Sequence, residues 1–393
     1  MRKILYLGRS EHARHYYSWA QDNGLHVDFF DFPSLTAGNH ESWAEMINSA
    51  HDLYQYDDII SFSDGLQVNV DLLKRIAGKP HRDPETIADF TDKIRFRKSL
   101  PRLDCIARWY ETSELRDSLP ARQWVESTVG YPVVIKPSNG FYSTGVTKVS
   151  ESDLFSKAWS QSRRAGEYFR KLHGHSSIIV EEYIDGKEFA IDGFIKNNCF
   201  YPMLFHIKRP DLTGPYFHET AYITMPFCSR KGEEFISIIR DVITATGLNN
   251  SPFHAEFRVT DSGQIYLLEI GPRLSGGGVT GQVMMDICCG LDAYYALHHL
   301  HDGEPLNYTH RMVGLEYDFC APRNGVLFDT EKTESLCHEL GARVVIKYRD
   351  DGDYVMCPPL NSETIITVFF ACSDRAGAES IFCELEKHQL GVK

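Results

Sequence analysis

The stretch Ser251–Gly278 constrains the fold more than any other part of the chain, because it predicts a β-hairpin that carries two facing carboxylates. Two short runs of apolar, aromatic and β-branched residues flank an Asp-Ser-Gly turn signal. With the turn centred between the serine and the glycine of this signal, Glu256 pairs with Glu269, and both side chains leave one face of the ribbon. Like charges directly opposite each other are destabilising. The pairing therefore predicts either a cation between the two side chains or a raised pKa on one of them.

The residue types around this hairpin are those of a site for a metal ion and an anion. Carboxylate oxygens suit Mg²⁺, which usually takes one or two protein carboxylates together with phosphate oxygens. Arg273 follows Glu269 by four residues, and the run Ser275–Gly278 lets backbone N–H groups approach an anion closely. The alternative interpretation is a surface hairpin whose acidic side chains are solvated.

Composition limits the classes of protein that fit. The chain has 393 residues, which is more than one compact core usually contains and predicts two or three lobes. Its residues are 42% hydrophobic and 24% charged, as in an ordinary globular protein. The net charge of −13 argues against nucleic acid or an anionic membrane surface as the main partner. The N-terminus lacks a signal-peptide core, and no apolar run approaches the ~20 residues of a membrane span, so we expect a cytoplasmic protein. The ten cysteines have no C-x-x-C spacing, which predicts neither a zinc site nor a disulfide framework.

The N-terminal part alternates between strands and helices. We expect strands at 3–8, 27–32 and 58–62, and helices at 12–23, 42–54 and 66–77. This alternation predicts a small parallel α/β lobe, which we expect to form part of a substrate wall. No G-x-G-x-x-G pattern follows Gly8, so a dinucleotide-binding fold is not supported.

A lysine and a small-residue loop come next. The segment 84–100 predicts one locally basic helix that contains Lys93. An apolar strand then ends on Lys136, which is costly to bury unless an anion pairs with it. The loop Ser138–Gly145 leads into a second strand, a pattern that suggests a hairpin covering a phosphate. It is not a Walker A loop, because the G-K-[ST] ending before a helix is absent.

Two further segments carry polar side chains of interest. The expected strand Ser177–Ile184 offers a backbone edge that could hydrogen-bond a purine, and Glu188 across the next turn could accept from sugar hydroxyls. An ordinary hairpin edge with exposed acids is the alternative. The tract His298–His301 has metal-binding residue types, but we interpret it as cations at a helix C-terminus.

The order and spacing of these motifs resemble the ATP-grasp superfamily over roughly residues 84–300. The matching features are the Asp-Lys pair at Lys93, V-V-I-K-P at Lys136, the small-residue loop, E-E-Y-I-D-G-K-E from Glu181 to Glu188, and the two hairpin carboxylates with Arg273. The resemblance implies a mixed α/β (α+β) ATP-grasp fold in four parts. These are an N-terminal parallel α/β lobe (1–83), a small ATP-lid lobe (84–190), a larger antiparallel catalytic lobe (191–309) and a C-terminal β-rich part (310–393).

The same resemblance implies the site residues. For ATP they are Lys93, Lys136, Ser138, Gly140, Ser143, Thr144, Gly145, Glu181, Glu182, Tyr183, Ile184 and Glu188. Mg²⁺, or Mn²⁺ in its place, is expected on Glu256 and Glu269. Catalytic roles fall to Arg273, Lys136, Gly276 and Gly277, and substrate-binding roles to Glu219, Tyr222, Arg273, Gly277 and Gly278. The family commonly has Asn where this chain has Gly271, so one metal ion is better supported than two.

Within the superfamily, the E-I-G-P-R-x-x-G-G form and the C-terminal part look similar to bacterial L-amino-acid ligases of the bacilysin-synthetase kind, although Tyr222 stands where a His is often found. This implies an ATP-dependent ligase that joins a carboxylate, here an amino acid, to an amine through an acylphosphate, with small molecules as partners. One alternative is an ATP-grasp ligase for a protein-tethered, carrier-bound or non-amino-acid carboxylate. Another is a nucleotide-binding module without chemistry. A homodimer is the commonest default assembly.

Overall fold

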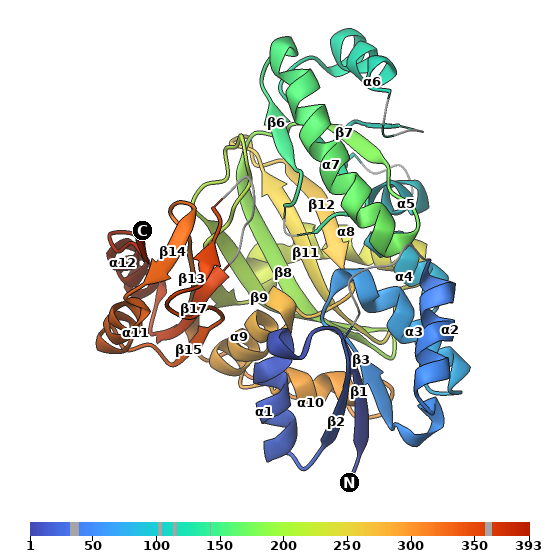
Figure 1. Ribbon diagram of the computed structural model, residues 1–393, viewed down its shortest axis with the longest axis vertical. Helices are drawn as coiled ribbons and strands as arrows, with labels where there is room; N and C mark the ends of the chain where they lie inside the picture. Colours follow the sequence, from blue (N-terminus) through green and yellow to red (C-terminus); the bar gives the residue numbers. More distant parts are fainter. Residues whose placement is uncertain (32–38, 101–103, 113–114, 116, 142, 358–363) are drawn as a thin grey trace.

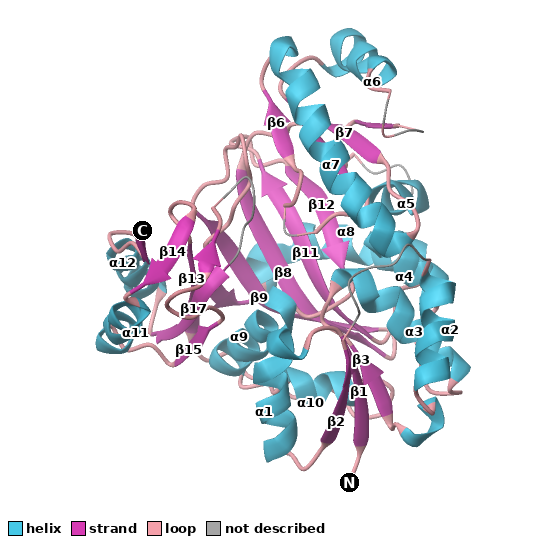
Figure 2. Cartoon of the chain, in the orientation of Figure 1, coloured by secondary structure: helices cyan, strands magenta, loops and turns pink. Residues whose placement is uncertain are grey.

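The chain folds into three lobes that surround a long antiparallel sheet (Figure 1). The computed structural model describes residues 1–31, 39–100, 104–112, 115, 117–141, 143–357 and 364–393. The N-terminal α/β lobe lies at one end of the molecule and a small lobe at the other, while the C-terminal part lies beside the large sheet. Figure 2 shows that the strands fill the centre and that most helices lie at the periphery.

The N-terminal lobe is a three-stranded parallel sheet in the order β2-β1-β3. Its strands are β1 (Lys3–Leu7), β2 (His26–Phe30) and β3 (Asp58–Ile60), and its helices are α1 (Arg14–Asp22), α2 (His40–Ala50) and α3 (Gln67–Ile76). The predicted parallel α/β lobe is therefore confirmed, since each predicted strand and helix overlaps one of these elements. Phe32, at the end of the second predicted strand, lies outside the described residues.

The helix predicted at 84–100 is in fact two helices, α4 (Pro84–Thr91) and α5 (Lys93–Ser99). Asp92 between them is extended, with φ −127° and ψ 118°, and its carboxylate accepts hydrogen bonds from two amides in the first turn of α5. The single-helix prediction was wrong because this aspartate caps a new helix. The break places Lys93 at the first position of α5.

The small lobe is an antiparallel sheet in the order β4-β7-β5-β6, with a long helix against it. Its elements are β4 (Trp109–Glu111), α6 (Leu119–Trp124), β5 (Val133–Pro137), β6 (Thr147–Val149), α7 (Phe155–His173) and β7 (Ile178–Glu182). Phe155, Ala158 and Trp159 of α7 pack with Val133 and Val180 in a separate core cluster. The lobe thus has its own hydrophobic core.

The large sheet has eight antiparallel strands in the order β12-β11-β8-β9-β10-β13-β17-β15. They are β8 (Lys187–Lys196), β9 (Cys199–Arg209), β10 (Ala221–Pro226), β11 (Ser251–Val259), β12 (Ile265–Gly271), β13 (Val313–Cys320), β15 (Val344–Lys347) and β17 (Thr364–Cys372). Helix α8 (Ser229–Thr246) packs on one face, where Ile191 and Phe257 point, and α9 (Val279–Cys289) packs on the other, where Phe194 points. Strand alternation also puts polar residues on the α9 face, and these build the site described below.

The C-terminal part contributes to two sheets. β13, β15 and β17 extend the large sheet, and a separate three-stranded sheet forms in the order β16-β14-β18. Its elements are β14 (Gly325–Phe328), α11 (Thr330–Glu339), β16 (Tyr354–Val355), α12 (Arg375–Leu385) and β18 (Gly391–Val392). Among the helices of the described residues, none is long and apolar enough to cross a membrane.

An ion cluster joins the N-terminal lobe to helix α10 (Ala293–His298). The carboxylate of Asp58 lies 2.6 Å from Lys74 Nζ and 2.8 Å from His298 Nδ1. The histidine stands in the last turn of α10 and is engaged with a protein carboxylate. Among the described residues, no group of three or more His, Cys, Asp or Glu side chains could hold a metal ion. The histidine tract therefore lies at the C-terminal end of α10, the position that the sequence predicts for it.

Candidate active site

A cavity of about 290 Å³ has walls from the N-terminal lobe, the small lobe and the large sheet. It brings together most of the predicted site residues, namely Lys93, Lys136, Gly140, Ser143, Glu181, Glu182, Tyr183, Ile184, Glu188, Glu219, Tyr222, Glu256, Glu269, Arg273, Gly276 and Gly277. Ser138, Thr144, Gly145 and Gly278 are the predicted residues that do not line it in the described part of the chain. Gly271 lies on its wall at the place where the family commonly has Asn.

Strands β11 and β12 form the predicted hairpin, and Glu256 pairs with Glu269 as predicted. The turn itself is centred on Ser262, because Val259 pairs with Ile265. A β-bulge next to Glu256 then shifts the register by one residue. The predicted turn centre, between Ser262 and Gly263, is therefore half a residue away from the observed one. The bulge compensates for this difference and brings Glu256 opposite Glu269.

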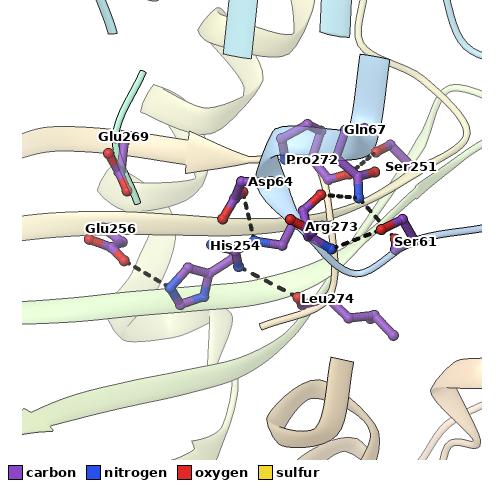
Figure 3. A network of polar contacts seen from close by, with 12 residues as sticks. Ser61, Asp64, Gln67, Ser251, His254, Glu256, Glu269, Pro272, Arg273 and Leu274 are labelled. Carbon is purple, nitrogen blue, oxygen red and sulfur yellow. Dashed lines mark hydrogen bonds and ion pairs between the residues drawn. The ribbon is translucent and has the colours of Figure 1, made fainter. Parts of the chain in front are cut away.

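Lysines compensate the two facing carboxylates. Glu256 Oε1 lies 3.2 Å from Lys208 Nζ, and Glu269 Oε2 lies 3.1 Å from Lys93 Nζ. Burial alone would raise the pKa of Glu256, but Lys208 and His254 hold it well below its usual range. The sequence predicts either a nearby cation or a raised pKa for the facing carboxylates. For Glu256 the nearby cation is the alternative that applies. Figure 3 shows the pair on neighbouring strands, with His254 donating to Glu256.

The donor set fits Mg²⁺ supported by a phosphate. Glu256 and Glu269 offer hard oxygen donors on adjacent strands at the cavity wall. Because the described residues hold no larger cluster of metal-ligating side chains, phosphate oxygens and water would have to complete the coordination. Mn²⁺ accepts the same oxygen donors. These two carboxylates are the residues of this chain that could hold such an ion.

A buried ion cluster lies at the small-lobe end of the cavity. Lys136, near the end of β5, forms an ion pair with Glu181 on the neighbouring strand β7. Arg97 Nη2 lies 2.9 Å from Glu181 Oε1. Burial raises the pKa of Glu181, but these two cations outweigh it and bring the pKa to about 2. Burial lowers the pKa of Lys136, and Glu181 offsets only part of that effect. The cost of burying this lysine is met by an anion, as expected from the sequence.

The small-residue loop is tied to the start of α5. The Ser138 hydroxyl donates to Asp92 at 2.7 Å, and the Lys93 ammonium donates to the Gly140 carbonyl at 2.8 Å. A Cβ at Gly145, where φ is +78°, would lie 2.5 Å from Ala165 of α7. Ser138 and Gly145 therefore shape the loop rather than face the cavity, and Tyr142 lies outside the described residues.

The predicted purine edge is partly engaged within the protein. The Tyr183 amide donates to the Pro132 carbonyl at 3.2 Å, and the Ile184 carbonyl accepts from Arg258 Nη1 at 2.8 Å. Arg258 also donates through Nε to Glu188 at 2.8 Å. Burial raises the pKa of Glu188 despite this partner and Lys208. The edge can still offer backbone groups to a base, but the Tyr183 amide is already used.

Lys208 of β9 lies at the centre of the cavity wall. Its ammonium is 2.7 Å from Glu219 Oε2 and 3.7 Å from Glu188 Oε2, in addition to its contact with Glu256. Burial would lower the pKa of Lys208, but the surrounding carboxylates raise it well above its usual range. The Tyr222 hydroxyl donates to Glu219 at 2.7 Å. Glu219 and Tyr222, the two predicted substrate residues, are thus hydrogen-bonded to each other, and Glu219 also contacts Lys208.

Arg273 reaches across to the N-terminal lobe. Its Nε donates to Asp64 Oδ1 at 2.7 Å, and Figure 3 shows the two side chains pointing toward each other beside the hairpin. Both residues line the cavity. The N-terminal lobe therefore forms part of the cavity wall, and its predicted role as a substrate wall stays a prediction.

Asp192 of β8 joins the glycine run Gly276–Gly278 to the β11–β12 hairpin. Its carboxylate accepts from the Ser275 hydroxyl and lies 2.5 Å from His254 Nδ1. Burial would lower the pKa of His254, but Asp192 raises it to about 9. A Cβ at Gly276, where φ is +53°, would lie 1.7 Å from Thr280 Oγ1. Asp192 therefore fixes the backbone that enters α9 against the cavity. Its strand, β8, lies two strands away from β12 in the sheet.

Sequence reasoning missed several polar residues at the site. Among them are Asp64, Arg97, Asp192, Lys208, His254 and Arg258. A usable signal existed for two of them, because Asp192 and Lys208 interrupt strands that are otherwise largely apolar, and buried charges need partners. The others gain their roles from contacts between distant parts of the chain.

The fold and the cavity define the class of protein. Residues 129–281 match the ATP-grasp domain, and the chain as a whole has the ATP-grasp fold. Its structure superposes on the crystal structure of the L-amino acid ligase from Bacillus licheniformis with a TM-score of 0.79. That comparison covers 100% of this chain and 99% of the other at 17% identity.

Two curated relatives are more similar in sequence over shorter segments. Dapdiamide A synthase of Enterobacter agglomerans is 26% identical over 158 residues, which cover 40% of this chain and 36% of that protein. The L-arginine-specific L-amino acid ligase of Bacillus subtilis is 23% identical over 233 residues, covering 58% of this chain and 54% of that protein. The chain thus spans between about a third and about a half of these two relatives.

Proposed function

We propose that the protein is an ATP-dependent ligase that joins a carboxylate, an amino acid in the first instance, to an amine. One observation carries this proposal. The cavity places Lys93 and Lys136 near the hairpin that bears Glu256, Glu269 and Arg273, which together are the charged groups that phosphoryl transfer to a carboxylate requires. The names of the relatives described above, which include amino-acid ligases, support the same class of reaction.

The chemistry needs activation of the acid, because a carboxylate does not react with an amine at neutral pH. A carboxylate oxygen of the substrate attacks the γ-phosphorus of ATP, and the bond to ADP breaks. The amine nitrogen then attacks the carbonyl carbon of the acylphosphate. Phosphate leaves, the nitrogen loses a proton, and an amide or dipeptide remains. Water must be excluded because it would hydrolyse the acylphosphate.

The small-lobe end of the cavity is assigned to ATP. Lys93 and Lys136 would bind the α- and β-phosphates, which would compete with the carboxylates that pair with both lysines in the protein alone. Glu188 would accept from the ribose, and the base would lie along the edge from Glu181 through Glu182 and Tyr183 to Ile184. The loop that includes Gly140, Ser143 and Thr144 would close over the phosphates.

Glu256 and Glu269 would hold Mg²⁺, which when bound neutralises charge on the phosphates. One ion is proposed rather than two, because Gly271 offers no side-chain oxygen where the family commonly has Asn. His254 keeps the Glu256 carboxylate in place through a hydrogen bond of 3.1 Å. Asp192 in turn holds His254 through a hydrogen bond of 2.5 Å.

Arg273 is assigned to the reacting groups. Its guanidinium, anchored through Nε by Asp64, presents further donors to the transferring phosphoryl group and to the oxyanion of the second step. The backbone amides of Gly276 and Gly277 lie on the same wall and would assist. Glu219 and Tyr222 would contact the amino-acid substrate. Gly278 is not given a direct role, because a Cβ there would meet Phe62 rather than the cavity.

The remaining assignments follow from this chemistry. We propose that residues 84–190 act as the lid lobe and 191–309 as the catalytic lobe, between the N-terminal lobe and the C-terminal part. The cytoplasm, which supplies ATP and keeps thiols reduced, suits an enzyme whose ten cysteines are all free. The partners would be a small carboxylate and a small amine, with a homodimer as the default assembly.

The test is phosphate release from ATP and Mg²⁺ across a matrix of free amino-acid pairs, with product masses measured in the positive wells. A product equal in mass to two amino acids minus water would establish the ligase and name its substrates. Bound ATP with no release in any well would exclude free amino acids as substrates and favour a tethered or non-amino-acid carboxylate.

A further inference from the structure

Two carboxylates at the β13 end of the cavity take no part in the chemistry described so far. Glu316 and Asp318 are two residues apart on β13, so both side chains leave the same face of the sheet. The ladder pairs Glu316 with Tyr222 of β10, which in turn pairs with Lys208 of β9. Both acids line the cavity. They therefore lie on the wall that carries the substrate residues, beyond Tyr222.

Hydroxyl groups orient both carboxylates. The Thr280 hydroxyl at the start of α9 donates to Glu316 Oε1 at 2.6 Å. The Thr367 hydroxyl of β17 donates to Asp318 Oδ1. Glu316 is only 7% exposed, and its Oε2 is buried without a hydrogen-bond partner among the described residues. A buried carboxylate oxygen left without a donor is costly, so this atom lacks a partner that a ligand could supply.

The other acidic side chains of the cavity wall each have a cationic partner. The pairs are Asp64 with Arg273, Glu181 with Lys136, Glu182 with Arg108, Glu188 with Arg258, Glu219 and Glu256 with Lys208, and Glu269 with Lys93. No Lys, Arg or His of the described residues forms an ion pair with Glu316 or Asp318. A ligand that balances the charge of Glu316 and Asp318 would therefore have to be positively charged.

Burial without a cationic partner also acts on the pKa values of the two carboxyl groups. Burial raises the pKa of Glu316 well above its usual range, and the nearby Asp318 raises it further. Burial also raises the pKa of Asp318, and Glu219 adds to the effect. Two buried carboxylates without a cation cannot both ionise readily. A ligand with a positive charge and N–H donors would replace the proton and supply the absent hydrogen bond.

We propose that Glu316 and Asp318 bind a cationic nitrogen group of the substrate, either a protonated amine or a guanidinium. The inference rests on the proposed function, because it places this group on one of the amino acids that the ligase would join. The shared chemistry is a positively charged nitrogen with several N–H donors, which suits two carboxylates better than a single hydroxyl would. It selects for substrates that keep their charge at this position.

Two sources of such a group are possible, and matched ligands distinguish them. If the site takes a side-chain cation, arginine should bind more tightly than citrulline, and lysine more tightly than Nε-acetyl-lysine, by about tenfold or more. If it takes an α-ammonium, arginine and citrulline should bind alike while their Nα-acetyl forms bind at least about tenfold more weakly.

The experiment measures binding of these ligands by calorimetry, with a non-hydrolysable ATP analogue and Mg²⁺ present. It compares the natural chain with Glu316→Gln and Asp318→Asn, and with Glu339→Gln as a control on the exposed surface of α11. Both site variants should lose the discrimination between charged and uncharged ligands, and the control should keep it. Melting temperature and affinity for the ATP analogue establish that each variant is folded.

Two results would overturn the inference. One is discrimination that survives unchanged in folded Glu316→Gln and Asp318→Asn. The other is the absence of binding by every charged ligand while the nucleotide analogue binds. Failure of the proposed function would give a different result, namely no phosphate release with any pair of amino acids. Binding of a cationic ligand, and its loss in the variants, can be measured without turnover. A ligase that joins amino acids, with ligand discrimination unaffected in both site variants, would retain the function and reject the inference.

Discussion

Lys208 Nζ lies 3.2 Å from Glu256 Oε1, which makes this buried ammonium the protein's own counter-ion for a carboxylate assigned to the metal. The same ammonium contacts Glu219 and Glu188, so one lysine links the hairpin carboxylate with the acids proposed to bind the substrate and the ribose. Its side chain is only 3% exposed. This ammonium thus contacts three acids from three parts of the chain, and Arg258 and His254 supply further positive charge to Glu188 and Glu256.

Lys208→Met should destabilise the fold by about 3–5 kcal/mol, because it leaves buried carboxylates without their cation. Mg²⁺ should restore more stability in this variant than in the natural chain, since the ion can supply part of the missing charge. Urea unfolding with and without Mg²⁺ measures both effects. Lys187→Met, at an exposed position on the neighbouring strand, is the matched control and should change stability little. A variant as stable as the control would refute the central role of Lys208.

Glu269→Ala should weaken Mg²⁺-dependent ATP binding by about tenfold or more, because it removes one of two proposed metal ligands. Calorimetric titration of ATP with and without Mg²⁺ gives the result directly. Glu304→Ala, an exposed acid outside the cavity, is the control. Unchanged ATP affinity in excess Mg²⁺ would count against the metal assignment.

Arg273→Ala should lower turnover by about 10²–10³-fold while ATP affinity stays largely intact, because the guanidinium is assigned to the transferring group rather than to the nucleotide. Asp64→Asn should give a smaller loss, since it removes the anchor at Nε but leaves the arginine in place. Phosphate release and ATP titration are measured on the same preparations. An equal loss of ATP binding and turnover would reject the role.

The elements of the fold were largely predictable, because each depends on local pattern. Alternating apolar segments define the N-terminal lobe, where each predicted strand and helix overlaps an element of the structure. The pairing of Glu256 with Glu269 was also predictable, although a bulge was needed to produce it. The break at Asp92 was missed because residues with helical pattern stand on both sides of it, with no glycine or proline between them.

The partners of the site residues were not predictable, because they are distant in sequence. The Arg97–Glu181 contact spans 84 positions, and the Arg273–Asp64 contact spans 209. Local pattern carries no information on such pairs, which depend on how the lobes pack. Lys136 needed an anion on physical grounds, but only the fold shows that Glu181 supplies it.

Asp58→Asn should make the protein less stable at neutral pH by about 3 kcal/mol, because it breaks the buried contacts with Lys74 and His298. Burial alone would raise the pKa of Asp58, but these partners hold it below its usual range. A depressed pKa in the folded state stabilises the fold above the unfolded value near 4, and this contribution is lost as the pH falls below it.

The difference in unfolding free energy between the natural chain and Asp58→Asn should therefore shrink between about pH 4 and pH 2. Urea unfolding across this range measures it. Asp22→Asn, at an exposed position at the end of α1, controls for the loss of one negative charge. A difference that stays constant into acid would show that Asp58 is not held ionised by its partners.

Binding of a cationic amino acid should release protons from the β13 end of the cavity. Burial raises the pKa of Asp318 to about 7, so below that pH this carboxyl group is mostly protonated before the ligand binds. The groups facing it are Glu316 on the same strand and Glu219 on the wall beside it, together with the hydroxyl of Thr367. A bound cation favours the ionised carboxylate and displaces the proton.

Affinity for arginine should therefore rise with pH up to about 7, by at most about tenfold per pH unit for each proton released. Calorimetry in two buffers of different ionisation enthalpy counts the protons. Asp318→Asn should reduce the count below pH 7, whereas Glu339→Gln should leave it unchanged. Because burial raises the pKa of Glu316 as well, Glu316→Gln should also reduce the number of protons released. Binding without proton release at any pH would mean that the two carboxylates do not face the ligand's charge.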